Sequence, residues 1–277
     1  MYIINGKKIK DKKLSKIKKE ISSLSFRPIF CDVLVGSDRA SLQYVNMKKR
    51  NAKTIGIDFH SANFKSSISI DNLIEKIRKL NEIQNMCGII VQLPLPKALN
   101  QKKVLDAINP KLDVDCLGKF ATGNFYKGNT DFGFPTALAC MELLDSTGVS
   151  LKNKKIIVLG QGKLVGRPVS FLLKKRGYSV INLNSRSSNK KEIIKRADVI
   201  ISGIGKGKYI KGDMIKKGVI LIDAGTSESG SGIVGDIDFE SVKNMASFLS
   251  PVPGGVGPVT IAMLFNNVLK VAKSKNE

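Results

Sequence analysis

Residues 155–166 read KIIVLGQGKLVG, a short apolar run that leads into a glycine-rich turn and then into a helix expected over residues 164–176. This order is the context of a dinucleotide site, because glycines let the backbone approach phosphate oxygens and a helix N-terminus offers N–H groups. The third glycine comes one residue later than in GxGxxG, so a plain tight turn is the alternative. The flanking strand and helix favour the dinucleotide site.

The same alternation continues along the second half of the chain. Strands are expected at residues 178–183, 198–204 and 219–224, with a helix at 190–196. Strands that alternate with helices predict a doubly wound parallel sheet, the Rossmann-like form of the α/β class. We expect residues 136–257 to form this cofactor domain.

The first half is also α/β. Apolar residues from Leu14 to Leu24 recur at helical spacing in a lysine-rich sequence. Further elements are expected as a strand at 28–37, a helix at 38–50, a helix at 71–80 and a strand at 88–93. Residues 109–135 have little periodicity and suggest an irregular crossing with functional loops. We therefore predict an N-terminal α/β substrate domain over residues 1–135. The apolar helix expected at 259–272 is too long for a frayed tail, so residues 258–277 are predicted to pack back on that domain.

Composition places the chain among soluble globular proteins. It has 277 residues, of which 42% are hydrophobic and 25% charged. No apolar run reaches the ~18 residues needed to cross a bilayer. The four cysteines form no CxxC pair, and His60 is the single histidine, so no metal site is predicted. We expect a cytoplasmic protein with no membrane partner.

The charge is extreme, since 46 Lys and Arg against 23 Asp and Glu give a formal net charge of +23. Such a surface attracts polyanions. A basic α/β module that binds RNA, a genome-wide drift toward lysine codons, and a preference for anionic small molecules would each explain it. The lysines are dispersed, aromatic residues make up only 6%, and no RNP-type motif is present, so specific nucleic-acid binding is not expected.

The end of the second strand of the cofactor domain predicts which dinucleotide binds. NAD sites usually place an acidic residue there for the ribose 2′-hydroxyl. This chain has Asn184, Ser185, Arg186 and Ser187 instead. A guanidinium with two hydroxyls suits a 2′-phosphate, so NADP is predicted, with NAD as the alternative.

Five polar positions in the first half are candidates for chemistry. Tyr44 and Lys48 stand four apart on one helix face, an arrangement that a lysine extended beside a half-buried tyrosine would also produce. Gln92 ends an otherwise apolar strand, where a buried amide needs partners. Asp113 and Asp115 could be loop caps, with one of them lining a pocket.

Residues 251–260 read PVPGGVGPVT and hold three prolines and three glycines immediately before a helix. Prolines stiffen the loop, and glycines let backbone groups approach a flat ligand closely.

This loop resembles the PVPGGVGPxT signature of the bifunctional methylenetetrahydrofolate dehydrogenase/cyclohydrolase family of the FolD type. Residues 35–48 are similar to that family's VGxxxxSxxYxxxK motif, and residues 91–96 (VQLPLP) match its VQLPLP motif. The resemblance covers essentially the whole chain. The other matching segments, in family order, are Asp113-Val114-Asp115, Val165-Gly166-Arg167-Pro168, Ser185-Arg186 and Gly235-Asp236.

The resemblance implies two reactions in one cleft between the domains. They are NADP-linked oxidation of 5,10-methylenetetrahydrofolate to the methenyl cation, and hydrolysis of that cation to 10-formyltetrahydrofolate. By resemblance, Lys48 is the central catalytic residue and Gln92 positions it, while Tyr44 orients the folate and Asp115 anchors the pterin. The residues that would border the substrate are Pro253, Gly254 and Gly255. The implied cofactor-binding residues are Gly160, Gln161, Gly162, Gly166, Arg167, Ser185, Arg186 and Thr226.

The resemblance also suggests a homodimer and a folate substrate with or without a polyglutamate tail. The chain departs from the family pattern at three places. Cys116 replaces a glycine, residues 135–139 lose a proline and a glycine, and Gln161-Gly162 stands in place of Arg-Ser. A dehydrogenase with weakened or lost cyclohydrolase activity is therefore the alternative among enzymes, and an RNA-binding module is the alternative from another class.

Overall fold

The computed structural model describes residues 1–230 and 232–276, which form two compact units. The first, here called the six-stranded unit, comprises Met1–Asp11 and Thr136–Met263. The second, the three-stranded unit, comprises Lys12–Pro135 and the described residues from Leu264 onward. Each unit is an α/β structure built on its own sheet.

One parallel sheet organises the six-stranded unit, with the strand order β1-β11-β8-β7-β5-β6. The predicted parallel sheet of the α/β class is therefore confirmed. Strands β5, β7 and β8 are buried along their whole length, as expected for central strands covered on both faces. The strands are β1 (Tyr2–Ile3), β5 (Ile156–Leu159), β6 (Val180–Leu183), β7 (Val199–Ser202), β8 (Ile220–Asp223) and β11 (Phe248–Ser250).

Short helices connect these strands and close a core on the sheet. Ile157, Ile200 and Leu221 on the strands pack in one buried cluster with Val242 of α9. Every element predicted between residues 155 and 224 is present within about two residues of its expected bounds. The connecting elements are α6 (Pro135–Asp145), α7 (Gly166–Lys175), α8 (Lys190–Lys195), the 3₁₀ turn η1 (Gly212–Met214), the hairpin β9 (Ser227–Ser229) and β10 (Gly232–Val234), and α9 (Phe239–Val242).

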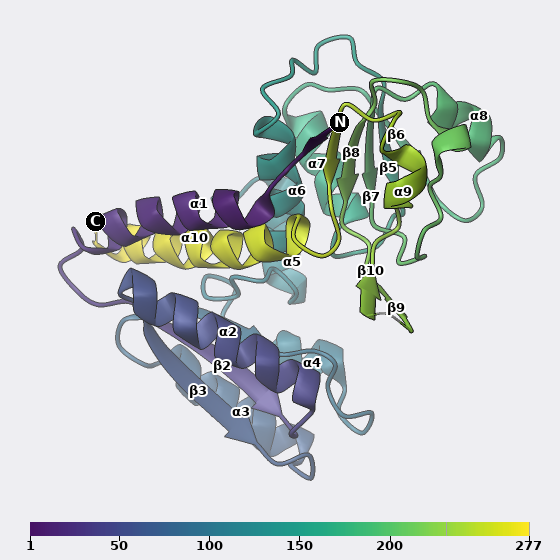
Figure 1. Ribbon diagram of the computed structural model, residues 1–277. Helices are drawn as coiled ribbons and strands as arrows, with labels where there is room; N and C mark the ends of the chain where they lie inside the picture. The colour runs from purple at the N-terminus through teal and green to yellow at the C-terminus, as the bar shows by residue number, and fades with distance from the viewer. Residues whose placement is uncertain (231, 277) are drawn as a thin grey trace. The chain divides into compact units, whose positions relative to one another are not determined.

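The three-stranded unit has a smaller parallel sheet with the order β3-β2-β4. Figure 1 shows α2 in front of this sheet and α3 behind it, as right-handed crossovers in opposite directions require. The strands are β2 (Ile29–Val35), β3 (Asp58–Phe64) and β4 (Met86–Val91), and the helices are α2 (Arg39–Ile55), α3 (Ile70–Asn81), α4 (Gln101–Leu105) and α5 (Lys119–Lys127).

Two long helices contribute residues to both units, namely α1 (Gly6–Ile21) and α10 (Val256–Asn276). Within the three-stranded unit, Phe265 of α10 packs edge-on against Phe30 at 5.4 Å between ring centroids. The Asn267 amide donates to the backbone oxygens of Val114 at 2.8 Å and Gly133 at 2.6 Å. This division differs from the predicted one at the start of the chain, because β1 pairs with β11 and so places residues 1–11 in the six-stranded unit.

Several elements differ from the sequence expectation. The edge strand β3 was not predicted, because its sequence DFHSANF is polar and largely exposed. The very short pair β1 and β11 gave no periodic signal. Residues 109–135, expected to be irregular, contain α5, whose buried side is formed by Ala121 and Phe125. No helix within the described residues is both long and apolar enough to span a bilayer.

Candidate functional site

A buried lysine is the centre of the candidate site in the three-stranded unit. The Asp38 carboxylate caps α2 by accepting from the Ser41 backbone N–H at 2.8 Å, which fixes where the helix starts after β2. Lys48 lies further along α2 with only 6% of its surface exposed. Its ammonium donates to Gln92 Oε1 at 2.8 Å and lies 2.6 Å from Asp32 Oδ2.

Gln92 comes directly after β4 and is oriented by its own backbone neighbours. Its backbone N–H donates to Val33 O at 2.8 Å, and its side-chain Nε2 donates to Leu93 O at 3.2 Å. The amide oxygen is thereby left to face Lys48. The structure therefore brings together two residues that the sequence analysis singled out 44 positions apart.

Asp32 completes this group and was missed by the sequence analysis. It lies in the middle of β2 and is fully buried, and apart from the ion pair of Oδ2 with Lys48 neither of its carboxylate oxygens has a hydrogen-bond partner among the described residues. Burial raises the pKa of the Asp32 carboxyl, against the opposing charge and hydrogen bond of Lys48. A lone aspartate inside the apolar run IFCDVLV was the signal that could have found it.

The loop after α4 supplies two carboxyl groups. Asp113 is buried and accepts from the Gly118 backbone N–H at 2.7 Å; burial raises its pKa to about 6, against the opposing backbone hydrogen bonds. Asp115 is half-buried. Burial raises the pKa of Asp115 to about 7, with the positive charge of Lys48 opposing the rise and the negative charges of Asp113 and Asp32 adding to it. Asp115 therefore lies in the electrostatic field of the lysine.

Two further positions of this unit were named in the sequence analysis, Tyr44 as a predicted site residue and Cys116 as a departure from the family pattern. Tyr44 is on α2 four residues before Lys48 and is 51% exposed, so its ring is accessible. Cys116, which stands in place of the family's glycine, adopts φ 59° and is buried. Its backbone N–H donates to Asp113 O at 3.0 Å, and its carbonyl accepts from Thr122 Oγ1 at 2.7 Å. The left-handed backbone that glycine favours is therefore kept by a cysteine.

The proline-glycine loop belongs to the six-stranded unit and is tightly built. Gly254 has φ 104°, and its carbonyl accepts from the Gly6 backbone N–H at 3.0 Å. The Gly255 N–H donates to Pro251 O at 2.7 Å. Pro253 follows a cis peptide bond. A Cβ at Gly6 would lie 2.0 Å from the Gly255 oxygen, so the loop depends on a glycine from the start of α1.

At the turn of residues 155–166, where a dinucleotide site is predicted, the six-stranded unit has a cavity of about 840 Å³. It opens where the strand order reverses between β5 and β7, at the carboxyl ends of the strands, which is where open α/β sheets bind ligands. Of the predicted cofactor residues, Gly160, Gln161, Gly162, Arg167, Ser185 and Arg186 line the cavity. Gly166 and Thr226 are not among the lining residues.

The glycines of this turn differ in the space that surrounds them. Gly160 has φ 89°, and a Cβ there would lie 2.6 Å from Gly203 O. A Cβ at Gly166 would lie 1.9 Å from the Gly160 oxygen, so the start of α7 can approach the turn only without a side chain. Gly162 has nothing within 4 Å of its hypothetical Cβ and leaves open space. The shifted spacing of the third glycine therefore still serves close packing of helix and turn.

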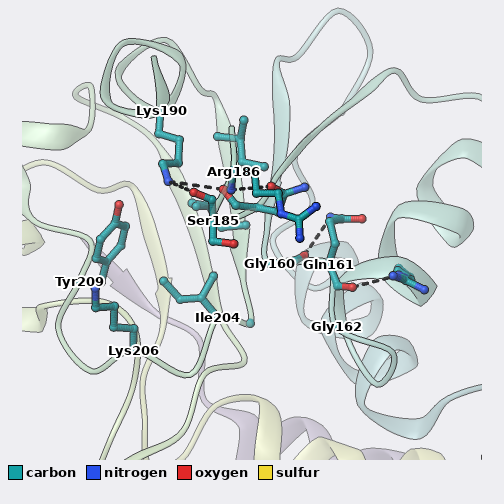
Figure 2. Close-up of a pocket in the computed structure, with 14 residues that line it drawn as sticks. Gly160, Gln161, Gly162, Ser185, Arg186, Lys190, Ile204, Lys206 and Tyr209 are labelled. Atoms are coloured by element: carbon teal, nitrogen blue, oxygen red, sulfur yellow. Dashed lines mark hydrogen bonds between the residues drawn. The ribbon is translucent and has the colours of Figure 1, made fainter. Parts of the chain in front are cut away.

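Every charged side chain that lines the cavity is cationic, namely Arg167, Arg186, Lys190 and Lys206. Figure 2 shows Arg186 extending toward Gln161, with Lys190 beside Ser185. Lys190 Nζ donates to the backbone oxygen of Ser185 at 2.9 Å. Lys190, Lys206 and Tyr209 also line the cavity and were not predicted from the sequence. Lys190 could have been found as a basic residue at the start of the helix after β6.

A buried carboxylate supports the wall of this cavity. Asp236 accepts from Ser202 Oγ at 2.7 Å and from the backbone N–H groups of Ile204 and Lys206 at 2.8 Å each. It was noted only as part of the Gly235-Asp236 match. Its three hydrogen bonds fix the loop after β7, which forms one side of the cavity.

A doubly wound sheet with a cationic cavity at its strand-order reversal, in a chain whose second α/β unit buries a lysine, defines a two-unit nicotinamide-dinucleotide enzyme. Two sequence comparisons identify its kind. Residues 135–276 match the model of the tetrahydrofolate dehydrogenase/cyclohydrolase NAD(P)-binding domain, and residues 4–115 match that of the catalytic domain. The chain belongs to the tetrahydrofolate dehydrogenase/cyclohydrolase family.

Relatives agree with this over the full length. The bifunctional protein FolD of Nitratiruptor sp. is 41% identical over 279 residues, covering 99% of each chain. The bifunctional FolD of Campylobacter jejuni is similar in structure, with a TM-score of 0.95 at 33% identity and 99% coverage of both chains. The Trypanosoma brucei FolD, solved with NADP cofactor and an inhibitor, has a TM-score of 0.91 at 30% identity, covering 99% of this chain and 98% of that one. The RNA-binding alternative is not favoured, because both halves match the enzyme family.

Proposed function

We propose that this chain oxidises 5,10-methylenetetrahydrofolate with NADP and hydrolyses the resulting methenyl cation to 10-formyltetrahydrofolate. The observation that carries the proposal is the buried Lys48 ammonium held between Gln92 and Asp32, in the part of the chain that matches the family's catalytic domain. The dehydrogenase with lost hydrolysis is less favoured, because Cys116 keeps a left-handed turn at the position where the family has glycine.

The residues of the cavity fit a phosphorylated dinucleotide. Gly160 and Gly162 leave the backbone open to a pyrophosphate, and α7 starts at this turn with its N–H groups. Bound NADP would supply a hydride acceptor. Gly160, Gln161, Gly162 and Gly166 would form the phosphate turn. Arg167, Ser185 and Arg186 would hold the rest of the cofactor, with Thr226 further along the same unit.

We propose NADP over NAD because of the charge of the residues expected around the ribose 2′ position. Ser185 and Arg186 line the cavity there, and no described lining residue carries a carboxylate that would hold a free ribose hydroxyl or repel a phosphate. Gln161 supplies no guanidinium, and Arg186 takes over that charge.

In the substrate half, hydride transfer needs positioning more than proton transfer. We assign Tyr44 to orient the folate ring and Asp115 to anchor the pterin, while Pro253, Gly254 and Gly255 border the substrate. Hydrolysis also needs a base, because the water that attacks the cation must lose a proton. Lys48, positioned by Gln92, assists that loss. The polar residues that act on the folate are thereby assigned to the three-stranded unit, and NADP is assigned to the six-stranded unit.

Further assignments are a homodimer, a cytoplasmic location and a folate that can carry a polyglutamate tail, for which the +23 charge gives a favourable surface. Light scattering of the purified chain measures the oligomeric state, and a comparison of KM for mono- and polyglutamylated folate measures the tail preference.

The function is tested by incubating the chain with methylenetetrahydrofolate and either NADP or NAD, with reduced cofactor and methenyl absorbance followed separately. We expect reduced cofactor to form with NADP and the methenyl species to be consumed afterwards. Absence of both signals from a folded protein would contradict the proposal. Accumulation of methenyl without its decay would leave only the dehydrogenase.

A further inference from the structure

We propose that Asp32 is a positioning residue for the hydrolysis: its carboxylate holds Lys48 against Gln92 and takes up the proton that Lys48 passes on when water attacks the substrate cation. This inference rests on the proposed function and adds to it a residue outside every motif of the sequence. Its basis is the contact of Asp32 Oδ2 with Lys48 Nζ at 2.6 Å inside the core of the three-stranded unit.

The Asp32 carboxylate lies on an apolar face of β2. Side chains alternate along a strand, so Asp32 shares the face of Phe30, which packs against Phe265 of α10. An aspartate on such a face is costly unless a cation pairs with it. Lys48 is the only ion-pair partner of Asp32 within the described residues, and the lysine side chain is itself 8% exposed. The carboxylate therefore acts as the counter-ion of Lys48 and is not a surface charge.

The Lys48 ammonium already has two partners inside the protein. An ammonium has three N–H donors and no lone pair. The Lys48 ammonium donates one N–H to Gln92 Oε1 and forms an ion pair with Asp32 Oδ2 at 2.6 Å, and an N–H that neither partner takes would serve the substrate. An ammonium cannot accept a proton, so Lys48 can take one from water only after it has given one away. Asp32 is the acceptor in contact with it.

Each bond formed in the proposed proton transfer is matched by a bond that breaks. The water oxygen forms a bond to the methenyl carbon, and one water O–H bond breaks. The released proton goes to Lys48 Nζ while another proton moves from Lys48 Nζ to Asp32 Oδ2. The lysine ends as ammonium, the aspartate as a neutral acid, and the cation as its neutral hydrate. Asp32 then returns its proton to solvent as the product leaves, so no other reactant is needed.

The surroundings of Asp32 favour its neutral form. Oδ1 is buried without a hydrogen-bond donor, so the negative charge is stabilised by Lys48 alone among the described residues. The other titratable groups that act here are Asp115, from the loop after α4, and the adjacent Cys31 thiol. The neighbouring strands place Ser61 and Ile90 opposite Asp32, neither of which carries a charge. Burial raises the pKa of the Asp32 carboxyl, as a proton acceptor at neutral pH requires.

The test compares Asp32→Asn and Asp32→Glu with the parent, using 5,10-methenyltetrahydrofolate for hydrolysis and methylenetetrahydrofolate with NADP for oxidation, each across a pH series. Asp58→Asn, which removes a carboxylate from the exposed ion pair with Arg27 on β3 of the same sheet, is the matched control. We expect Asp32→Asn to lower kcat for hydrolysis by ~10²-fold with KM changed by less than about threefold. The fold-decrease in the oxidation rate should be smaller than the fold-decrease in the hydrolysis rate by a factor of at least about ten.

The pH profile separates proton uptake from support of the fold. In the parent, the ratio of the hydrolysis rate to the oxidation rate should fall toward low pH as Asp32 becomes protonated, because protonation of Asp115 at the substrate affects both reactions. Asp32→Asn should lose this acid limb of the ratio and Asp32→Glu should keep it. A folded Asp32→Asn variant with unchanged hydrolysis, or with parallel losses in both reactions and the acid limb retained, would overturn the inference. If Asp32→Asn does not fold, the acid limb of Asp32→Glu decides, because a longer carboxylate must move its midpoint if it is the acceptor. A parent that does not hydrolyse the methenyl substrate would instead overturn the proposed function, and this inference with it.

Discussion

At the scale of single residues, Lys48 combines burial with two partners that fix its position. We expect Lys48→Met to lower hydrolysis of the methenyl cation by ~10²–10⁴-fold, the usual effect of losing one proton-transfer residue. Binding of NADP, measured by fluorescence titration, should stay nearly intact because the cavity residues lie in the other unit. Lys49→Met changes the exposed neighbour on the same helix and serves as the control. An unchanged hydrolysis rate in a folded Lys48→Met protein would remove the lysine from the mechanism.

Arg186 carries the prediction about cofactor choice. A charge-assisted hydrogen bond contributes ~1.5–3 kcal/mol, so one guanidinium could supply roughly a tenfold to hundredfold preference for NADP over NAD. We expect Arg186→Ala to remove most of that preference. The measurement is kcat/KM with each cofactor in the parent, in Arg186→Ala and in Arg196→Ala, an exposed arginine that does not line the cavity. A parent enzyme that prefers NAD would show the charge argument to be wrong.

The candidate residues show what a sequence can and cannot reveal at this scale. Gln92 could be predicted to need a partner, because an amide at the end of an apolar strand must be satisfied. That its partner would be Lys48, and that Asp32 would join them, could not be predicted, because the contacts depend on how α2 packs on the sheet. The aspartate was hidden in a run whose apolar character identified the strand correctly.

At the scale of elements, the join between β5 and α7 depends on Gly166. We expect Gly166→Ala to destabilise the chain by ~1–3 kcal/mol and to weaken NADP binding, because its Cβ would lie 1.9 Å from the Gly160 oxygen. Gly162→Ala, in the same turn but with open space around it, should cost much less stability. Urea unfolding and cofactor titration of both variants check this. Equal losses of stability at the two positions would show that the close approach does not matter.

Asp198 ties together three segments of the parallel sheet. It stands just before β7, accepts from the Lys155 backbone N–H at 2.7 Å before β5, and pairs with Lys216 at 2.7 Å before β8. Burial acts to raise the pKa of Asp198, but the hydrogen bonds from Lys216 and Lys155 outweigh it, so the pKa is lowered. A lowered pKa in the folded state means stability that is present above the usual value of 3.8 and is lost as the pH falls through the lower one.

We therefore expect Asp198→Ala to lower the free energy of unfolding by about 1–2 kcal/mol at neutral pH. The difference from the parent should shrink as the pH falls below 3.8, because the parent then loses the same interactions. Urea unfolding at several pH values measures it, with Asp213→Ala, an exposed aspartate of the same unit, as the control. A difference that persists undiminished at about pH 2 would contradict the assignment to the charged carboxylate.

Elements were predictable where periodicity is strong and side chains are buried on a fixed face. The alternating strands and helices from residue 155 to 224 and the apolar C-terminal helix are present as expected. Strand β3 was not predictable in this way, because an edge strand held by backbone pairing to β2 can keep polar side chains on most of its length. Strands β1 and β11 have two and three residues, too few for any period to show, and they pair only because the chain returns from a distance of more than 240 positions.

At the scale of the whole molecule, each unit is discontinuous in sequence, and this could be predicted only in part. The apolar length of the last helix indicates that it packs on something, and Phe265 and Asn267 do contact the three-stranded unit. The same helix nevertheless begins with residues that belong to the six-stranded unit, and residues 1–11 join that unit too. A helix shared between two units carries no sequence signal of where one unit ends, because its side chains are buried on both sides of the boundary.

The net charge of +23 is the remaining property of the molecule as a whole, and it also gives the last prediction. Four cationic side chains line the cavity proposed for the dinucleotide, but the other lysines are spread along the chain, as in the exposed positions of α1. Phosphates that meet scattered lysines release counterions, so any binding of nucleic acid should be independent of sequence and should weaken at least about tenfold between roughly 50 and 200 mM salt. Filter binding of several unrelated RNAs across a salt series measures this. Arg186→Ala should leave the salt dependence unchanged, because one cavity residue adds little to a dispersed charge. A complex that selects one sequence and survives physiological salt would instead require a defined RNA site on this enzyme.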